Sequence, residues 1–241
     1  MSAIQARETV GEMVANRPAL SRVFEQVGID YCCGGKKTLE QACEEKGLDI
    51  ESVRATLEAC SATAGEPVVD AASMSLTELA DHIEQTHHAY LRREFPRLDW
   101  LTQKVATVHG DHEPRLLQIR QTYLELVEEL SSHMMKEEMV LFPLIRQLDA
   151  SSAAPTFHCG SLANPMRQME AEHHDAGAAL EALSDLSDNY TPPEWACNTY
   201  RAMLDALAHL QFDMHQHVHK EESILFPKAL ALEAKFSGKE A

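Results

Sequence analysis

The chain has 241 residues, enough to bury a hydrophobic core without disulfide bonds, and 44% of them are hydrophobic. Its formal net charge of −17 disfavours binding to nucleic acid and to anionic membranes, because both need a basic surface. No apolar run is long enough to span a bilayer, and the first residues lack the apolar core of a secretion signal. We therefore expect a cytoplasmic protein whose six cysteines are reduced.

Helix-start signals mark the first part of the chain. Thr9 and Thr38 each precede a Glu or Gln by three residues, which is the capping-box pattern. Short helices are predicted over residues 9–15, 18–27, 38–46 and 50–61. Residues 62–74 are small and include Gly and Pro, so we interpret them as a linker. The sequence thus predicts a small helical domain over residues 1–61.

Four long helices are predicted after the linker, since Ser75 opens a further capping box and strand-like alternation is nearly absent. The predicted ranges are 76–106, 114–148, 165–187 and 192–233. Asn164-Pro165 and Thr191-Pro192 predict where the third and fourth helices begin, because proline is tolerated in a first helical turn. Short loops between long helices favour antiparallel neighbours, so we expect an all-α, up-down four-helix bundle over residues 75–241.

The bundle region contains an internal repeat. The segment EEMVLFP at 137–143 returns as EESILFP at 221–227, and a histidine precedes each copy by four residues, at His133 and His217. Two helix pairs with matched motifs indicate a pseudo-twofold bundle with a site on its axis.

The repeated histidines and glutamates fall at positions where helical spacing predicts buried leucines. His133 and Glu137 share one apolar stripe, His217 and Glu221 share another, and His173 lies in a third. A single histidine on an apolar face is more often a hydrogen-bonded core residue than a ligand. Two in-register copies favour a metal site instead, because buried carboxylates need a compensating cation. Imidazole with carboxylate suits iron, manganese or zinc.

The first long helix leaves a choice between two neighbours. His87 and His88 are adjacent, and the apolar stripe permits either as a ligand. His88 lies 45 residues before His133, close to the 44 that separate His173 from His217, so the spacing favours His88. His82, His209, His215 and His219 are expected to be surface or supporting residues, and we assign His109, His112 and His158 to loops.

These motifs, together with the segment DYCCGGK at 30–36, resemble the Repair of Iron Centers family of hemerythrin-like di-iron proteins. The resemblance covers essentially the whole chain. It implies two oxo- or hydroxo-bridged iron ions, with Glu137 and Glu221 bridging them. The six implied ligands are His88, His133, Glu137, His173, His217 and Glu221. It also implies a function: repair of iron–sulfur clusters damaged by nitrosative or oxidative stress, by donation of iron.

Two other functions stay open under the same resemblance. One is an enzyme that reduces nitric oxide or peroxide at the di-iron site, and the other is a sensor that binds a diatomic gas. Oxygen carriage is disfavoured, because the oxygen-carrying hemerythrins use an extra histidine and an aspartate. The implied partners are damaged iron–sulfur proteins, with nitric oxide or peroxide as small molecules, and a homodimer stays open.

Cys32 and Cys33 are adjacent in a glycine-rich turn. We interpret them as an iron relay or a redox pair, against the alternative of two half-buried thiols without a role. Lys36 and Lys37 lie close in sequence and would lower a thiol pKa if they approach it in space. The remaining cysteines are expected to be structural on helices (Cys43, Cys60 and Cys197) or to lie in a loop (Cys159).

Overall fold

The computed structural model describes residues 8–62, 70–153 and 155–236. Over these ranges the chain is helical and contains no β-strand, although Thr9 and Thr38 form one isolated antiparallel bridge. The all-α prediction is confirmed. Among the described residues, no helix combines the length and the apolar character needed to cross a membrane. The described residues divide into two compact units.

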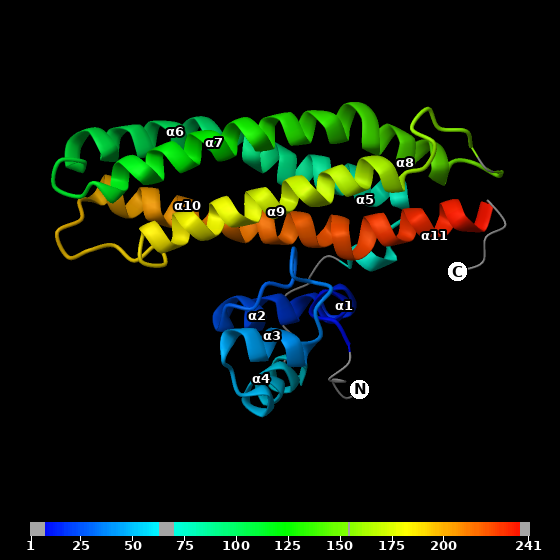
Figure 1. The fold of residues 1–241 in the computed structure, drawn as a ribbon, viewed down its shortest axis with the longest axis horizontal. Helices are drawn as coiled ribbons and strands as arrows, with labels where there is room; N and C mark the ends of the chain where they lie inside the picture. The colour runs from blue at the N-terminus through cyan, green and yellow to red at the C-terminus, as the bar shows by residue number, and fades with distance from the viewer. Residues whose placement is uncertain (1–7, 63–69, 154, 237–241) are drawn as a thin grey trace. The chain divides into compact units, whose positions relative to one another are not determined.

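The first unit contains the described residues up to 79 together with 148–153 and 215–236. Its N-terminal part consists of short helices (Figure 1), namely α1 (Val10–Asn16), η1 (Pro18–Leu20), α2 (Ser21–Val27), α3 (Leu39–Lys46) and α4 (Ile50–Ala62). A core of buried side chains that includes Met13, Phe24 and Leu57 joins these helices. We call residues 8–62 the cysteine module.

The predicted capping boxes begin the helices of the cysteine module. The Thr9 hydroxyl accepts the N–H of Glu12, and the Glu12 carboxylate accepts the N–H of Thr9 at 3.0 Å. Thr38 caps α3 in the same way. Gly28 and Gly47 end α2 and α3 in the left-handed conformation, which glycine adopts without steric cost. The module's helices therefore lie within one residue of their predicted bounds.

The first unit also includes segments from later in the chain. These are η2 (Ala71–Ser73), the start of α5 (Leu76–Ile83), the end of α10 (Asn198–Lys220), η5 (Glu221–Leu225) and α11 (Phe226–Phe236). Of the predicted linker 62–74, residues 63–69 lie outside the described residues. Helix α1 packs on η5 through Gly11, where an added Cβ would come within 2.7 Å of Ser223 Oγ.

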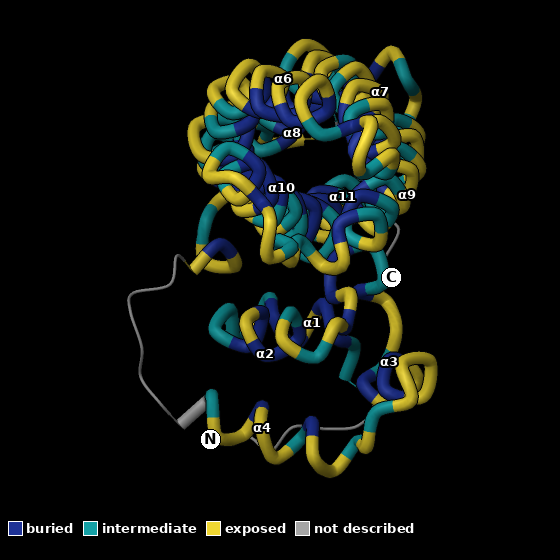
Figure 2. Tube along the Cα trace, turned by 90° about the vertical axis from the view of Figure 1, so that its left-hand side faces the viewer, coloured by how far each residue is buried: buried dark blue, intermediate teal, exposed yellow. Residues whose placement is uncertain are grey.

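The second unit contains residues 80–147 and 155–214 and forms a four-helix bundle. Its four long helices are α6 (Ala89–His109), α7 (Arg115–Lys136), α9 (Ala163–Leu186) and most of α10. Helix α8 (Phe142–Asp149) continues α7 after a short π-helical segment. Seen end-on, the buried residues of these helices face one another (Figure 2). Leu98, Leu126 and Leu207 are among the fully buried side chains. The predicted bundle is confirmed.

Two predicted helix starts are wrong. Helix α9 begins at Ala163, and the Asn164 side chain donates to the Cys159 carbonyl instead of capping the helix. Helix α10 begins at Asn198 rather than at Pro192. Residues 188–190 have positive φ, and Pro193 disfavours the helical conformation in the proline before it. The segment before Asn198 is therefore a loop, and Cys197 precedes the helix instead of lying on it.

Three of the long helices in the described part of the chain contain a π-helical segment, which the sequence pattern did not predict. These segments are η3 (Glu84–His88), η4 (Glu137–Leu141) and η5. Both η4 and η5 end at a Phe-Pro pair. Proline has no N–H, and its ring crowds the carbonyl four residues earlier, so the turn before it opens. No comparable proline marks η3.

Candidate metal centre

All six residues to which the resemblance gives ligand roles are buried, and the structure brings them into two groups of four. Within each group, one ligand atom per residue lies within 4.8 Å of the others. The first group is His88, Glu137, His217 and Glu221. The second group is His133, Glu137, His173 and Glu221. Each group therefore has two imidazoles of its own, while both glutamates are common to the two groups.

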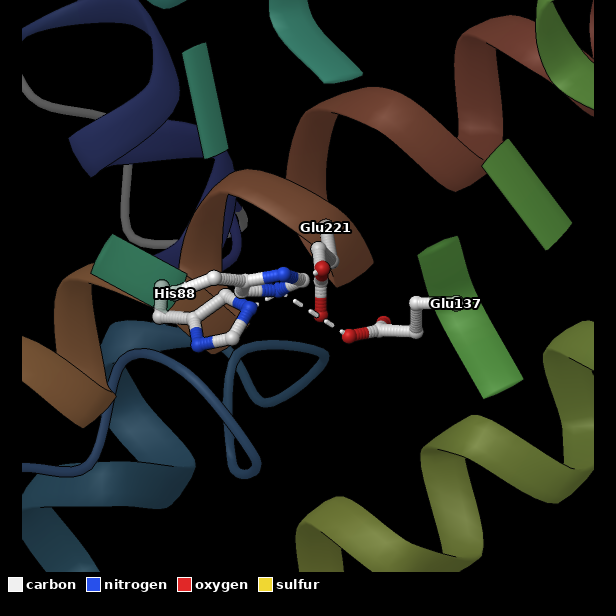
Figure 3. A group of neighbouring side chains, drawn as sticks. His88, Glu137 and Glu221 are labelled. Carbon is white, nitrogen blue, oxygen red and sulfur yellow. Dashed lines mark hydrogen bonds and ion pairs between the residues drawn. The ribbon is translucent and has the colours of Figure 1, made fainter. Parts of the chain in front are cut away.

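The π-helical segments place the shared glutamates. Glu137 is the first residue of η4, Glu221 is the first residue of η5, and His88 is the last residue of η3. Figure 3 shows these three side chains pointing toward one another. His133 and His217 lie one turn earlier, on α7 and α10. A π-helical bulge inside an α-helix redirects side chains and often occurs at functional sites.

Glu137 is fully buried and faces imidazole nitrogens. Its Oε2 lies 3.2 Å from His88 Nε2, and its Oε1 lies 3.4 Å from His133 Nε2. Neither oxygen accepts a hydrogen bond from the described residues. Glu221 is also fully buried, with Oε1 3.1 Å from His217 Nε2. Buried carboxylates in such surroundings are costly, so cations held between these oxygens and nitrogens fit the arrangement.

A carboxylate supports the outer nitrogen of His88. The Nδ1 of His88 lies 2.7 Å from Glu138 Oε1, and Arg92 donates to both oxygens of Glu138. Burial raises the pKa of Glu138, but the hydrogen bonds from Arg92 and His88 outweigh it and leave the pKa below its ordinary value. A carboxylate at Nδ1 holds the ring proton there, so the Nε2 lone pair points toward Glu137.

His133 has an equivalent support from the neighbouring helix. Its Nδ1 lies 2.9 Å from Glu172 Oε2, and Lys136 and Gln168 donate to the other oxygen of Glu172. Burial raises the pKa of Glu172, yet these hydrogen bonds lower it to about 2. The inner Nε2 of His133 lies 3.1 Å from Nε2 of His173. The carboxylate therefore orients His133 as Glu138 orients His88.

The roles of Glu138 and Glu172 were not predicted, although each residue has a signal in the sequence. Glu138 is the second glutamate of the repeated motif, and Glu172 directly precedes His173. A carboxylate that directly precedes or follows an expected ligand in sequence can hydrogen-bond to a ligand on a neighbouring helix.

The other histidines lie outside both groups. His87 is turned to Asp213, with Nδ1 2.9 Å from Oδ1, so the structure places His88 and not His87 with the glutamates. His219 is buried against the Tyr31 ring, and His109 ends α6 instead of lying in a loop. His112, His158 and His209 are exposed.

Asp30, Cys32 and Cys33 form a third set of close ligand atoms. The Cys32 thiol donates to Asp30 Oδ1 at 3.0 Å, and its Sγ lies 3.9 Å from Cys33 Sγ. The hydrogen bond with Cys33, burial and the Asp30 charge raise the pKa of Cys32 well above its ordinary value. Lys37 pairs with Glu45. The expectation that nearby lysines lower a thiol pKa is therefore wrong for Cys32.

Tyr31 connects the Cys-Cys turn to the end of α10. Its hydroxyl donates to Glu25 at 2.7 Å and accepts a hydrogen bond from Gln216. Its ring also contacts the rings of His215 and His219, with centroids 6.2 Å and 5.5 Å away. The residue before Cys32 thus contacts α10 on both sides of His217, and the position of the turn is tied to that helix.

Comparisons with known proteins agree with this geometry. Residues 79–229 match the family described as Hemerythrin HHE cation binding domain, and residues 6–61 match ScdA_N, described as a domain of unknown function (DUF542). The chain is 40% identical over 227 residues to the iron-sulfur cluster repair protein YtfE of Enterobacter sp. (strain 638), a match that covers 93% of this chain and 97% of that protein.

Two further relatives with the same name give similar values. The identity is 40% over 226 residues for the protein of Escherichia coli O157:H7 and 38% over 226 residues for that of Citrobacter koseri, again with 93% of this chain and 97% of each relative covered. The buried His and Glu groups are positioned to hold a di-iron centre. The chain belongs to the Repair of Iron Centers family of hemerythrin-like proteins.

Proposed function

We propose that this chain repairs iron–sulfur clusters damaged by nitrosative or oxidative stress, by donating iron from its bundle. The observation that carries the proposal is the sharing of Glu137 and Glu221 by two buried groups, because carboxylates within reach of both groups can hold two iron ions close together in a helix bundle. The relatives named as cluster repair proteins, which match nearly the whole chain, support the same function.

His88 and His217 would hold one iron and His133 and His173 the other, with Glu137 and Glu221 available to both. The bound pair would supply redox-active iron that can be exchanged. The protein's own contribution is to hold the four imidazoles with Nε2 inward and to keep the carboxylates away from water. Glu138 and Glu172 serve the first task by fixing the outer nitrogens of His88 and His133.

Cys32 and Cys33 have the role of an iron relay in this proposal, with a redox role as the alternative for the same pair. Two sulfurs and the Asp30 carboxylate lie close enough to share one ion as cargo. The contacts of Tyr31 with α10 and of Gly11 with Ser223 support this role, because they tie the cysteine module to the segment that carries Glu221.

The proposal also names the partners, the compartment and the role of each part of the chain. Its partners are proteins with damaged iron–sulfur clusters, and nitric oxide or peroxide are the agents of damage. The net charge of −17 favours neither nucleic acid nor an anionic membrane as a partner. We place the reaction in the cytoplasm, where free thiols stay reduced. Residues 1–61 act as the relay domain, residues 62–74 as a linker and residues 75–241 as the iron store.

The test is recovery of activity in a cluster enzyme that has been inactivated with nitric oxide under anaerobic conditions. The iron-loaded full chain should restore activity, and the double variant Cys32→Ser, Cys33→Ser at equal bound iron should restore far less, because serine is a poor ligand for ferrous iron. Cys60→Ser is the matched control. Cys60 is a half-buried thiol of the same module that donates to the Ala19 carbonyl, which a serine hydroxyl can also do.

Equal recovery with the double variant would remove the relay role while leaving iron donation intact. No recovery with the wild-type chain would contradict the repair function itself. Catalytic consumption of nitric oxide or peroxide with an electron donor, without loss of bound iron, would favour the enzyme. Reversible gas binding without turnover or iron loss would favour the sensor.

A further inference from the structure

At one end of the bundle, the end of α6 lies beside the start of α10 (Figure 1). There the Nε2 of His109, the last residue of α6, lies 3.4 Å from the Sγ of Cys197, which directly precedes α10. Cys197 is exposed and is not in a disulfide bond. His109 is 21 residues beyond His88, about 30 Å along an α-helix, so the pair is separate from the metal centre.

The backbone that holds Cys197 is fixed by hydrogen bonds. Its carbonyl accepts the N–H of Arg201, which makes Cys197 the residue that caps α10. The Arg201 guanidinium donates to three carbonyls of the preceding loop, those of Pro193, Glu194 and Ala196. One side chain thus ties the loop to the first turn of α10. The thiol stands on an ordered support next to the imidazole.

Aromatic rings stand around His109. The Trp195 ring lies 5.7 Å from the His109 ring and 5.6 Å from the Tyr200 ring, and Tyr200 stacks on His109 at 6.2 Å. Trp195 is 42% exposed. These contacts limit the orientations of the imidazole. They also place an exposed apolar surface near the thiol, against which the carbon chain of a small molecule can pack.

We propose that Cys197 and His109 form a site of thiol exchange with low-molecular-weight disulfides. Nε2 of His109 accepts the thiol proton, and the Cys197 sulfur attacks one sulfur of the small disulfide. A new S–S bond joins Cys197 to half of that molecule while the original S–S bond breaks. The departing thiolate takes the proton from His109. Cys197 is oxidised, one half of the disulfide is reduced to a thiol, and no other reactant is needed.

Cys197 is the exposed thiol among the six cysteines, whereas Cys33, Cys60 and Cys159 are half-buried. Cys32 is buried, and its thiol donates to Asp30 Oδ1. Cys43 is also buried. The mixed disulfide on Cys197 is reversible and shields the sulfur from irreversible oxidation when disulfides accumulate. This site adds a thiol-based response to oxidants that does not depend on the iron function.

The proposal is tested by adding oxidised glutathione to the iron-loaded full chain and following adducts by intact mass and peptide mapping. The first adduct should map to Cys197 and form at least about tenfold faster than any other. Cys197→Ser should abolish that fast adduct. His109→Ala should slow it about tenfold, and added imidazole should restore the rate, since free imidazole can take the proton that His109 accepts.

His112→Ala is the matched control. His112 contacts the same Trp195 ring at 4.8 Å, and the rate should stay at the wild-type value in this variant. Circular dichroism and bound iron, both unchanged in every variant, show that the bundle is intact. A first adduct on another cysteine would overturn the proposal. So would a wild-type rate in His109→Ala, or a slow rate in that variant that imidazole does not restore.

Discussion

The segments η4 and η5, each taken with the Phe-Pro pair that follows it, have nearly the same sequence, EEMVLFP and EESILFP, and each begins with a fully buried glutamate. Their outer faces differ. In the first copy Met139 is 73% exposed and Val140 is 39% exposed, whereas in the second Ile224 is 6% exposed and Ser223 lies against Gly11. The repeat therefore sets the inner side of both segments, and the third and fourth positions decide what covers the outer side.

We call the ligands from the first two long helices (His88, His133 and Glu137) the first half of the centre and those from the last two (His173, His217 and Glu221) the second half. The two halves have different neighbours. In the first half, His88 and His133 lean on the carboxylates Glu138 and Glu172. In the second half, His217 lies between residues that contact Tyr31 of the cysteine module. Among the described residues, only the second half therefore has the Cys-Cys turn as a neighbour through Tyr31.

The largest effect is expected for the shared glutamates. Glu137→Ala and Glu221→Ala should each lose most of the bound iron, because either change removes a ligand from both groups. The loss should be similar in the two variants, despite their different outer neighbours. Metal analysis of the purified proteins measures it, with Met139→Ala as a control that keeps its iron. Wild-type iron in either glutamate variant would show that the shared-ligand assignment is wrong.

Glu138→Gln and Glu172→Gln should weaken iron binding by about 10–100-fold, because a neutral amide polarises the ring N–H less than a carboxylate does. Competition with a chelator of known affinity measures the change. Both variants act on ligands of the first half, His88 and His133, and should leave the fold intact. Unchanged iron affinity would mean that the carboxylates of Glu138 and Glu172 do not affect how strongly His88 and His133 bind iron.

Much of the centre could be predicted from spacing, and the missing parts have physical causes. The stripe positions of His133, Glu137, His217 and Glu221 follow from the helical period. The matched spacing of the two half-motifs also favoured His88 over His87, but the π-helical segment η3 that contains both residues was not predicted, because no proline directly follows it in sequence. Glu138 and Glu172 act across helices, so no period within one helix predicts their partners.

The fold shows the same limits. Helix starts with a complete capping box, at Thr9 and Thr38, were predicted to within one residue. The start of α10 was misplaced, because the residues with positive φ before Thr191 and the second proline after it override the capping pattern. For the same reason the contact between Cys197 and His109 was not predicted. The sequence pattern placed Cys197 on a helix and His109 in a loop, whereas Cys197 precedes α10 and His109 ends α6.

A swap of the third motif position tests the contrast between η4 and η5 directly. Ser223→Met, which copies the first half, should destabilise the protein by about 1–3 kcal/mol, because the longer side chain meets the backbone at Gly11. It should also lower cluster repair while sparing bound iron. The reciprocal Met139→Ser should change stability by no more than about 0.5 kcal/mol, as expected for an exposed position. Chemical denaturation measures both, and equal effects of the two swaps would contradict the contrast.

The smallest effect on the centre is expected for the histidine that the structure turns away from it. His87→Ala should leave the visible spectrum of the iron-loaded protein nearly unchanged, since His87 bonds to Asp213. His88→Ala should alter that spectrum strongly, because His88 belongs to the group that contains both glutamates. The reverse order of effects would move the ligand by one residue.

The binding of two iron ions by shared glutamates is tested by a Mössbauer spectrum of the full chain loaded with enriched iron, together with metal analysis of the same sample. Two groups that share Glu137 and Glu221 predict two iron ions per chain. With the oxo or hydroxo bridge that the family resemblance implies, two ferric ions should couple antiferromagnetically into a pair without net magnetism. A single iron per chain, or two ions with independent magnetic spectra, would contradict the shared site on which the proposed function rests.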